Sequence, residues 1–115
     1  MKDFYCDKII SKKVEVDIVF ETEKVLAFHH TNPYFMVHIV IIPKIHIDSL
    51  STFDLDKNLS HEFLKAISFV TKLVEDKHGG CRVSSNIGNY QSTKHLHWYV
   101  HYGERIRKEN GDTIH

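Results

Sequence analysis

The feature that most constrains the fold is a long stretch of helical periodicity from about Leu55 to Lys77. Apolar residues recur there every three or four positions, a spacing typical of a helix that packs one face against a core. Gly79 and Gly80 follow the stretch and can end a helix in the left-handed conformation. The main apolar stripe comprises Leu59, Phe63, Ile67, Val70 and Val74, and Leu64 and Leu73 widen it.

Segments rich in Val and Ile lie on both sides of this stretch and predict strands. Short connections between the early segments imply antiparallel pairing. A further short helix is expected from Phe4 to about Ser11, and a polar tail from about residue 104. We therefore expect one α+β domain over residues 1–115, with one long helix, a short N-terminal helix and an antiparallel sheet of about five strands. The predicted strands are Glu15–Phe20, Val25–His29, His38–Ile42, Cys81–Asn86 and His95–Tyr102.

Composition excludes several classes of protein. The chain has 115 residues, and its 15 Lys and Arg balance 15 Asp and Glu, which argues against a general nucleic-acid binder. No apolar run reaches the roughly 18 residues of a membrane span, and the N-terminus lacks the apolar stretch of a signal peptide. The two cysteines, Cys6 and Cys81, have no C-x-x-C spacing and are expected to be reduced thiols. We expect a cytoplasmic protein.

The chain contains ten histidines, and three of them lie at alternate positions of one predicted strand. Alternate side chains of a strand share a face, so His95, His97, Tyr99 and His101 are expected to point one way. Leu96, Trp98, Val100 and Tyr102 would then point towards the core.

Three interpretations of this histidine face stay open on the residues alone. It could be an exposed polar face, although such faces usually carry Thr, Lys or Glu. It could bind a metal through His95 and His97 with His38 as a third ligand, although no carboxylate or cysteine lies nearby in sequence. It could carry nucleophilic catalysis on phosphorus, since residues 86–93 offer amides, hydroxyls and a glycine that could bind phosphate oxygens.

Two blocks of sequence resemble the histidine-triad (HIT) superfamily. Residues 91–97 followed by Tyr99 read QSTKHLH-x-Y and are similar to the family signature H-x-H-x-H, often preceded by Gln-Ser. Upstream, LAF at residues 26–28, Asn32-Pro33 and HIVIIPKIH at residues 38–46 are similar to the family's LAF-D-x-x-P…H-x-L-V-I-P-K-x-H block. The resemblance covers about residues 4–103, and it implies a HIT-like fold that typically forms a homodimer.

The resemblance also implies a reaction and the residues that carry it. Family enzymes are nucleotide hydrolases or transferases that act at the α-phosphate through a covalent nucleotidyl-histidine and need no metal for that step. His97 would be the nucleophile and His95 would orient it. Tyr99 stands where the third histidine belongs, and a phenol donates a hydrogen bond but brings no positive charge at neutral pH.

The expected substrate-binding residues follow from the same blocks. Gln91 and Ser92 would contact the phosphate or the leaving group, His38 would line the phosphate site, and Asn86 would bind on the phosphate or ribose side. His30 stands where many members have an aspartate that binds the ribose hydroxyls, and an imidazole cannot accept both hydroxyls.

We therefore predict a nucleotide hydrolase or nucleotidyl transferase that acts at the α-phosphate through His97. The substrate would be a nucleotide or nucleotide conjugate, with no metal, cofactor, nucleic acid or membrane. The alternatives are a catalytically weakened nucleotide-binding module, which Tyr99 and His30 motivate, and a histidine-based metal-binding protein.

Overall fold

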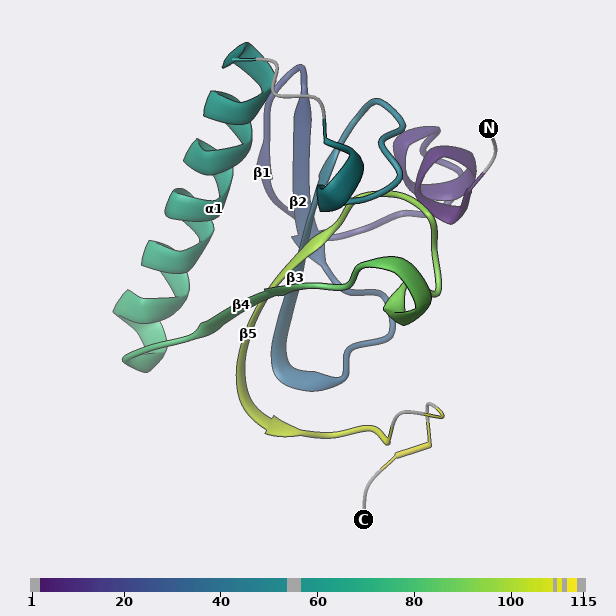
Figure 1. The fold of residues 1–115 in the computed structure, drawn as a ribbon. Coiled ribbons are helices and arrows are strands. Elements are labelled where there is room, and N and C mark those ends of the chain that lie inside the picture. The colour runs from purple at the N-terminus through teal and green to yellow at the C-terminus, as the bar shows by residue number, and fades with distance from the viewer. Residues whose placement is uncertain (1–2, 54–56, 109, 111, 114–115) are drawn as a thin grey trace.

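Five antiparallel strands form one sheet in the order β1-β2-β3-β5-β4 in a computed structural model, which describes residues 3–53, 57–108, 110, 112 and 113 (Figure 1). The predicted α+β class is confirmed. Every neighbouring pair in the sheet is antiparallel, as the short early connections indicated. The strands are Ile18–Glu21 (β1), Val25–His29 (β2), Phe35–Pro43 (β3), Arg82–Ser85 (β4) and Trp98–Arg105 (β5).

The long helix, α1, spans Lys57–His78 and packs on one face of the sheet (Figure 1). Its predicted beginning at Leu55 lies outside the described residues. At its other end Gly79 adopts a φ of 92° and donates its N–H to the carbonyl of Glu75, which ends the helix as expected. The buried residues of this helix are Leu59, Phe63, Ala66, Val70 and Val74.

Leu64 and Leu73 do not widen the buried stripe as predicted. Their side chains are 67% and 48% exposed, respectively. The sheet covers only one side of α1, so apolar residues outside the narrow contact stripe stay at the surface.

The N-terminal segment covers part of the opposite face of the sheet. A helical turn of π type, Tyr5–Ile10 (η1), lies across the sheet from α1 (Figure 1). Its Tyr5 and Ile9 are buried with Leu26, Phe28 and Val40 in a second core cluster. The central strand β3 is consequently buried on both faces from His38 to Pro43, as its continuous apolar run predicted.

The last strand begins three residues later than predicted, at Trp98 rather than at His95. Ile41 pairs with Trp98, and the next ladder positions of β3 run into Pro43, which has no N–H to donate. The N–H of Leu96 donates instead to the carbonyl of Ile47 at 2.6 Å. The predicted alternation is still observed, because Leu96 and Val100 are fully buried against the core on the α1 side.

Two shorter helical turns, Leu50–Thr52 (η2) and Gly88–Tyr90 (η3), complete the described helices. Both cysteines are free. Within the described residues, no helix has the length and apolar character needed to cross a membrane.

Candidate active site

Strand register brings the distant histidines together on the face of the sheet opposite α1. His38 of β3 pairs with His101 of β5, and Val40, the next residue of β3 on the same face, pairs with Tyr99. His30 follows β2, and its ring stacks on that of His38 with centroids 4.4 Å apart. Residues from three strands therefore meet at one end of this face, beyond the part that η1 covers.

His97 has the tautomer that a nucleophile requires. Its Nδ1 lies 2.7 Å from the carbonyl oxygen of His95, which can only accept, so Nδ1 carries the proton. Nε2 then holds a free lone pair, and burial lowers the pKa of the ring, so the imidazole is neutral at pH 7. The residue is only 1% exposed.

Tyr99 lies beside His97, with its ring centroid 5.0 Å from that of His97 and 4.5 Å from that of His38. Burial raises the pKa of Tyr99, which keeps the phenol protonated as a hydrogen-bond donor. The ring of Tyr5 of η1 packs against that of His97, with centroids 5.5 Å apart. This contact could not be predicted from the sequence, because Tyr5 reads as one apolar residue of a short helix.

His30 and His38, which we call the cavity histidines, are both neutral donors. The N–H of Asn32 donates to Nδ1 of His30, and the N–H of Tyr34 donates to Nδ1 of His38, so each ring carries its proton on Nε2. Burial lowers the pKa of His30 to about 4 and that of His38 to about 3. His38 is 4% exposed, and its Nε2 has no hydrogen-bond partner among the described residues.

A cavity of about 680 Å³ opens beside this group. Five of the predicted site residues line it, namely His30, His38, Asn86, Ser92 and Tyr99. Eight further residues that were not among the predicted site residues also line it. These are Asn32, Tyr34, Phe35, Ser84, Asn89, Tyr90, His101 and Arg105.

Three predicted site residues do not line the cavity. His97 is only 1% exposed and His95 is fully buried, and neither is among the lining residues. The side-chain amide of Gln91 donates to the carbonyls of Asp48 and Thr93, and its Oε1 accepts from the N–H of Gly88. Gln91 therefore holds the loop in place through all of its polar atoms.

His95 joins a different group of residues, which we call the N-terminal cluster and which comprises Asp3, Cys6, His46 and His95. Its Nδ1 lies 3.1 Å from Oδ2 of Asp3 and 3.5 Å from Sγ of Cys6. Nδ1 of His46 bonds to the same carboxylate oxygen of Asp3. One donor atom from each of the four residues lies within 4.8 Å of the others, and these atoms are ligand types that bind zinc.

The outer hydrogen bonds of both histidines suit metal binding. Nε2 of His95 donates to the carbonyl of Pro43 at 2.9 Å, and Nε2 of His46 donates to Oδ1 of Asp48 at 2.6 Å. Such bonds fix the ring and direct Nδ1 towards the cluster, where a metal ion would replace the Nδ1 contacts with Asp3. Burial raises the pKa of Asp3, but the N–H of Cys6 and the two imidazoles lower it to about 2, so the carboxylate is ionised.

The metal site considered from the sequence combined His95 with His97 and His38, and the structure does not group them. Nδ1 of His97 and Nδ1 of His38 are both held by backbone groups, and His95 faces Asp3 and Cys6. Sequence reasoning missed these two residues because they lie 92 and 89 positions from His95.

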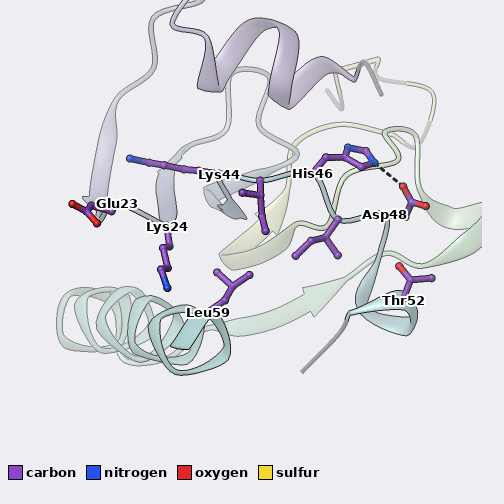
Figure 2. A pocket seen from close by; sticks show the side chains of 9 residues that line it. Glu23, Lys24, Lys44, His46, Asp48, Thr52 and Leu59 are labelled. Carbon is purple, nitrogen blue, oxygen red and sulfur yellow. Dashed lines mark hydrogen bonds and ion pairs between the residues drawn. The ribbon is translucent and has the colours of Figure 1, made fainter. Parts of the chain in front are cut away.

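A second cavity, of about 560 Å³, lies between His46 and the beginning of α1 (Figure 2). Its lining mixes charges of both signs, with Lys24 and Lys44 opposed by Glu23 and Asp48. The bond from His46 to Asp48 crosses one side of it (Figure 2). It contains no residue of the H-x-H-x-Y segment, so the cavity beside Tyr99 is the candidate active site.

Comparison with known proteins gives consistent matches over most of the chain. The family model of the HIT domain matches residues 11–105. A 14 kDa zinc-binding protein of Zea mays is 37% identical over 105 residues, which cover 87% of this chain and 81% of that protein. Adenylylsulfatase HINT1 of Arabidopsis thaliana is 35% identical over 105 residues, which cover 87% of this chain and 71% of that protein.

Solved structures agree with the sequence matches. A HIT family hydrolase from Clostridium thermocellum superposes with a TM-score of 0.73 at 28% identity, covering 93% of this chain and 95% of its own. A hypothetical histidine triad nucleotide-binding protein from Sulfolobus tokodaii gives a TM-score of 0.76 at 29% identity, covering 86% of this chain and 67% of its own. With its two sequence blocks, its five-stranded sheet and these matches, the chain belongs to the histidine-triad (HIT) superfamily.

Proposed function

We propose that this protein is a nucleotide hydrolase or nucleotidyl transferase that acts at the α-phosphate through a covalent nucleotidyl-histidine on His97. The observation that carries the proposal is the tautomer of His97, because its protonated Nδ1 leaves the lone pair on Nε2. The names of two similar proteins, a HIT family hydrolase and an adenylylsulfatase, support the same class of reaction.

In the first step, Nε2 of His97 attacks the α-phosphorus, and the bond from phosphorus to the leaving group breaks. The leaving group departs with the electron pair and takes a proton from water. The carbonyl of His95 accepts from Nδ1 and stabilises the positive charge on the ring. In the second step, water or another acceptor attacks phosphorus, the P–N bond breaks, and neutral His97 is restored.

We assign the surrounding residues by their places in the cavity. The phenol of Tyr99 donates to a non-bridging phosphate oxygen, while Ser92 and Asn86 supply further polar contacts. His95 positions His97 through its carbonyl, and Gln91 acts indirectly by holding the loop.

The test compares wild type with His97→Ala and with His61→Ala, a control on the exposed side of α1. Adenosine 5′-phosphoramidate and adenylyl sulfate are the substrates. We expect His97→Ala to lose at least about 10³-fold in turnover, while His61→Ala stays near wild type. Substrate labelled at the α-phosphorus should leave an acid-labile label on wild type after quenching. Equal turnover by wild type and His97→Ala, or a label retained by His97→Ala, would overturn the assignment.

A weakened nucleotide-binding module is the second candidate, favoured by the 1% exposure of His97 and by the neutral Tyr99. It predicts nucleotide binding without a labelled intermediate. A Tyr99→His variant that gains about 10-fold or more in turnover would favour this module over a fully active enzyme.

Metal binding at the N-terminal cluster is a third candidate, because this donor set has the composition of a zinc site and two similar plant proteins are named zinc-binding. Zinc would be held by Sγ of Cys6, an oxygen of Asp3 and Nδ1 of His46 and His95, and it would tie the N-terminal segment to the sheet. Metal analysis of protein purified without a histidine tag should find about one zinc per chain. A fully folded, zinc-free sample that takes up no zinc on titration would exclude this candidate.

We also propose a cytoplasmic homodimer whose two sheets join through β4. This strand lies at the edge of the sheet, and its Val83 is 39% exposed. Light scattering should give twice the chain mass for wild type and the mass of one chain for Val83→Lys. A monomeric wild type would contradict the dimer.

A further inference from the structure

The cavity beside Tyr99 offers many hydrogen-bond donors and no carboxylate among the described residues that line it. The two cavity histidines contribute to this excess of hydrogen-bond donors. Their Nδ1 atoms accept from backbone N–H groups, so the atoms left for a ligand are two Nε2–H donors. Their rings stack at 4.4 Å and act as one unit.

His38 gives independent evidence that a ligand belongs here. The residue is 4% exposed and lines the cavity, yet its Nε2–H has no partner among the described residues. A buried donor without an acceptor is rare in folded proteins. A ligand oxygen in the cavity would satisfy it.

The charged surroundings of the pair are all basic. The charged or titratable neighbours that lower the pKa values of His30 and His38 are His97, His101, Arg105 and Arg107, besides the pair itself. No acidic neighbour acts on either ring in the described part of the chain. The histidines are neutral at pH 7, so Arg105 gives this end of the cavity its positive charge, and the described lining holds no carboxylate to offset it.

Arg105 is the permanent cation of the cavity wall. Its guanidinium lies 5.6 Å from the ring centroid of Tyr34 and 5.9 Å from that of Phe35. These two rings also contact the cavity histidines. The ring centroids of Tyr34 and His30 lie 6.2 Å apart, and those of Phe35 and His38 lie 5.4 Å apart. The arginine is thus held near the two N–H donors.

A free ribose diol and a phosphate need opposite kinds of hydrogen-bonding partner in the cavity wall. Two neighbouring hydroxyls need an acceptor for their protons, whereas a phosphate only accepts at neutral pH. We propose that the nucleotide bound here carries a second phosphate on a secondary hydroxyl of its sugar, and that His30, His38 and Arg105 bind it. This inference rests on the proposed function, because it places the reacting phosphate at Tyr99 and His97.

The test measures the affinities of 5′-AMP, 5′-ADP and adenosine 3′,5′-bisphosphate by calorimetry at 150 mM salt, with the 2′,5′ isomer as a further probe. 5′-ADP carries its additional phosphate at the 5′ position rather than on a secondary hydroxyl, so it controls for the additional negative charge alone. We expect one bisphosphate to bind at least about 10-fold more tightly than 5′-AMP and more tightly than 5′-ADP.

Two variants and one control assign the effect. His30→Asp keeps an acceptor for the N–H of Asn32, so the local turn is retained, and it should reverse the preference in favour of 5′-AMP. Arg105→Gln should lower bisphosphate affinity about 10-fold and change 5′-AMP affinity little. Lys72→Gln removes the same charge from the exposed side of α1 and should change neither.

Failures of the two proposals give different results. If 5′-AMP binds as tightly as both bisphosphates, or if His30→Asp leaves the ratio unchanged, the second-phosphate proposal is wrong while the nucleotide site stands. If none of the nucleotides binds and no substrate turns over, both proposals fail.

Discussion

The N-terminal cluster and the cavity histidines place the same side chain in opposite surroundings on one face of the sheet. His46 and His95 each face the carboxylate of Asp3, and the bond to Asp48 further raises the pKa of His46. His30 and His38 face basic groups, and burial lowers the pKa values of both. The first group thus suits a cation and the second an anion, and the neighbouring acids make the difference.

The largest expected effect concerns zinc affinity. Cys6→Ala removes the sulfur ligand of the N-terminal cluster and should weaken zinc binding at least about 100-fold, while His30→Asn should leave it unchanged. Competition with a chromophoric zinc chelator measures both. Equal weakening by both variants would show that the two groups do not act separately.

His95→Ala should cause the next largest change. The side chain is fully buried and bonds through both ring nitrogens, to Asp3 and to the carbonyl of Pro43. Its loss leaves Asp3 and the carbonyl of Pro43 without this hydrogen-bond partner and should lower the free energy of unfolding by about 2–4 kcal/mol. Urea unfolding measures this, with the exposed His29→Ala as a control that should change it by less than about 0.5 kcal/mol. Similar values for the two variants would contradict the structural role of His95.

Tyr99→Phe should lower turnover about 10- to 100-fold, because it removes one hydrogen bond worth about 1–3 kcal/mol to the phosphate. The ring packing on His97 and His38 is retained, so stability and zinc affinity should not change. Steady-state kinetics on adenosine 5′-phosphoramidate, beside a thermal melt of each protein, separates the two effects. Unchanged turnover would remove Tyr99 from the reaction.

The smallest effect is on the pH dependence of stability. His30 has a pKa of about 4 when folded and about 6.5 when unfolded, so between these values the unfolded chain binds the extra proton. Stability should therefore fall as the pH falls from 6.5 to 4. Because His30 is partly exposed, solvent screening should keep the slope from this residue well below the limit of about 1.4 kcal/mol per pH unit. The groups that face His30 are His38, Tyr34, Tyr99, His97 and Arg107, and none of them is acidic.

His30→Asn provides the comparison for this pH effect, because its amide oxygen can still accept from the N–H of Asn32. Urea midpoints of both proteins at a series of pH values should show a smaller slope for the variant. Identical slopes would place His30 in a less buried environment than the structure gives it.

Local sequence signals were enough to predict the elements and their class. The 3.6-residue period of α1, the continuous apolar run of β3 and the alternation of Leu96 and Val100 are local signals, and each follows from which side chains must leave water. The two blocks around His38 and His97 indicated the family and part of the cavity lining, because these residues already lie at characteristic spacings in the chain.

The partners of each histidine, in contrast, could not be predicted without the folded structure. No local pattern shows that Asp3 and Cys6 reach His95 across the chain, that Tyr5 packs on His97, or that Arg105 and His101 join the cavity. These contacts depend on the docking of η1 and on the pairing of β3 with β5. A histidine's charge state depends on its burial and its neighbours rather than on its place in the sequence, so the fold makes one group of imidazoles fit for a cation and the other for an anion.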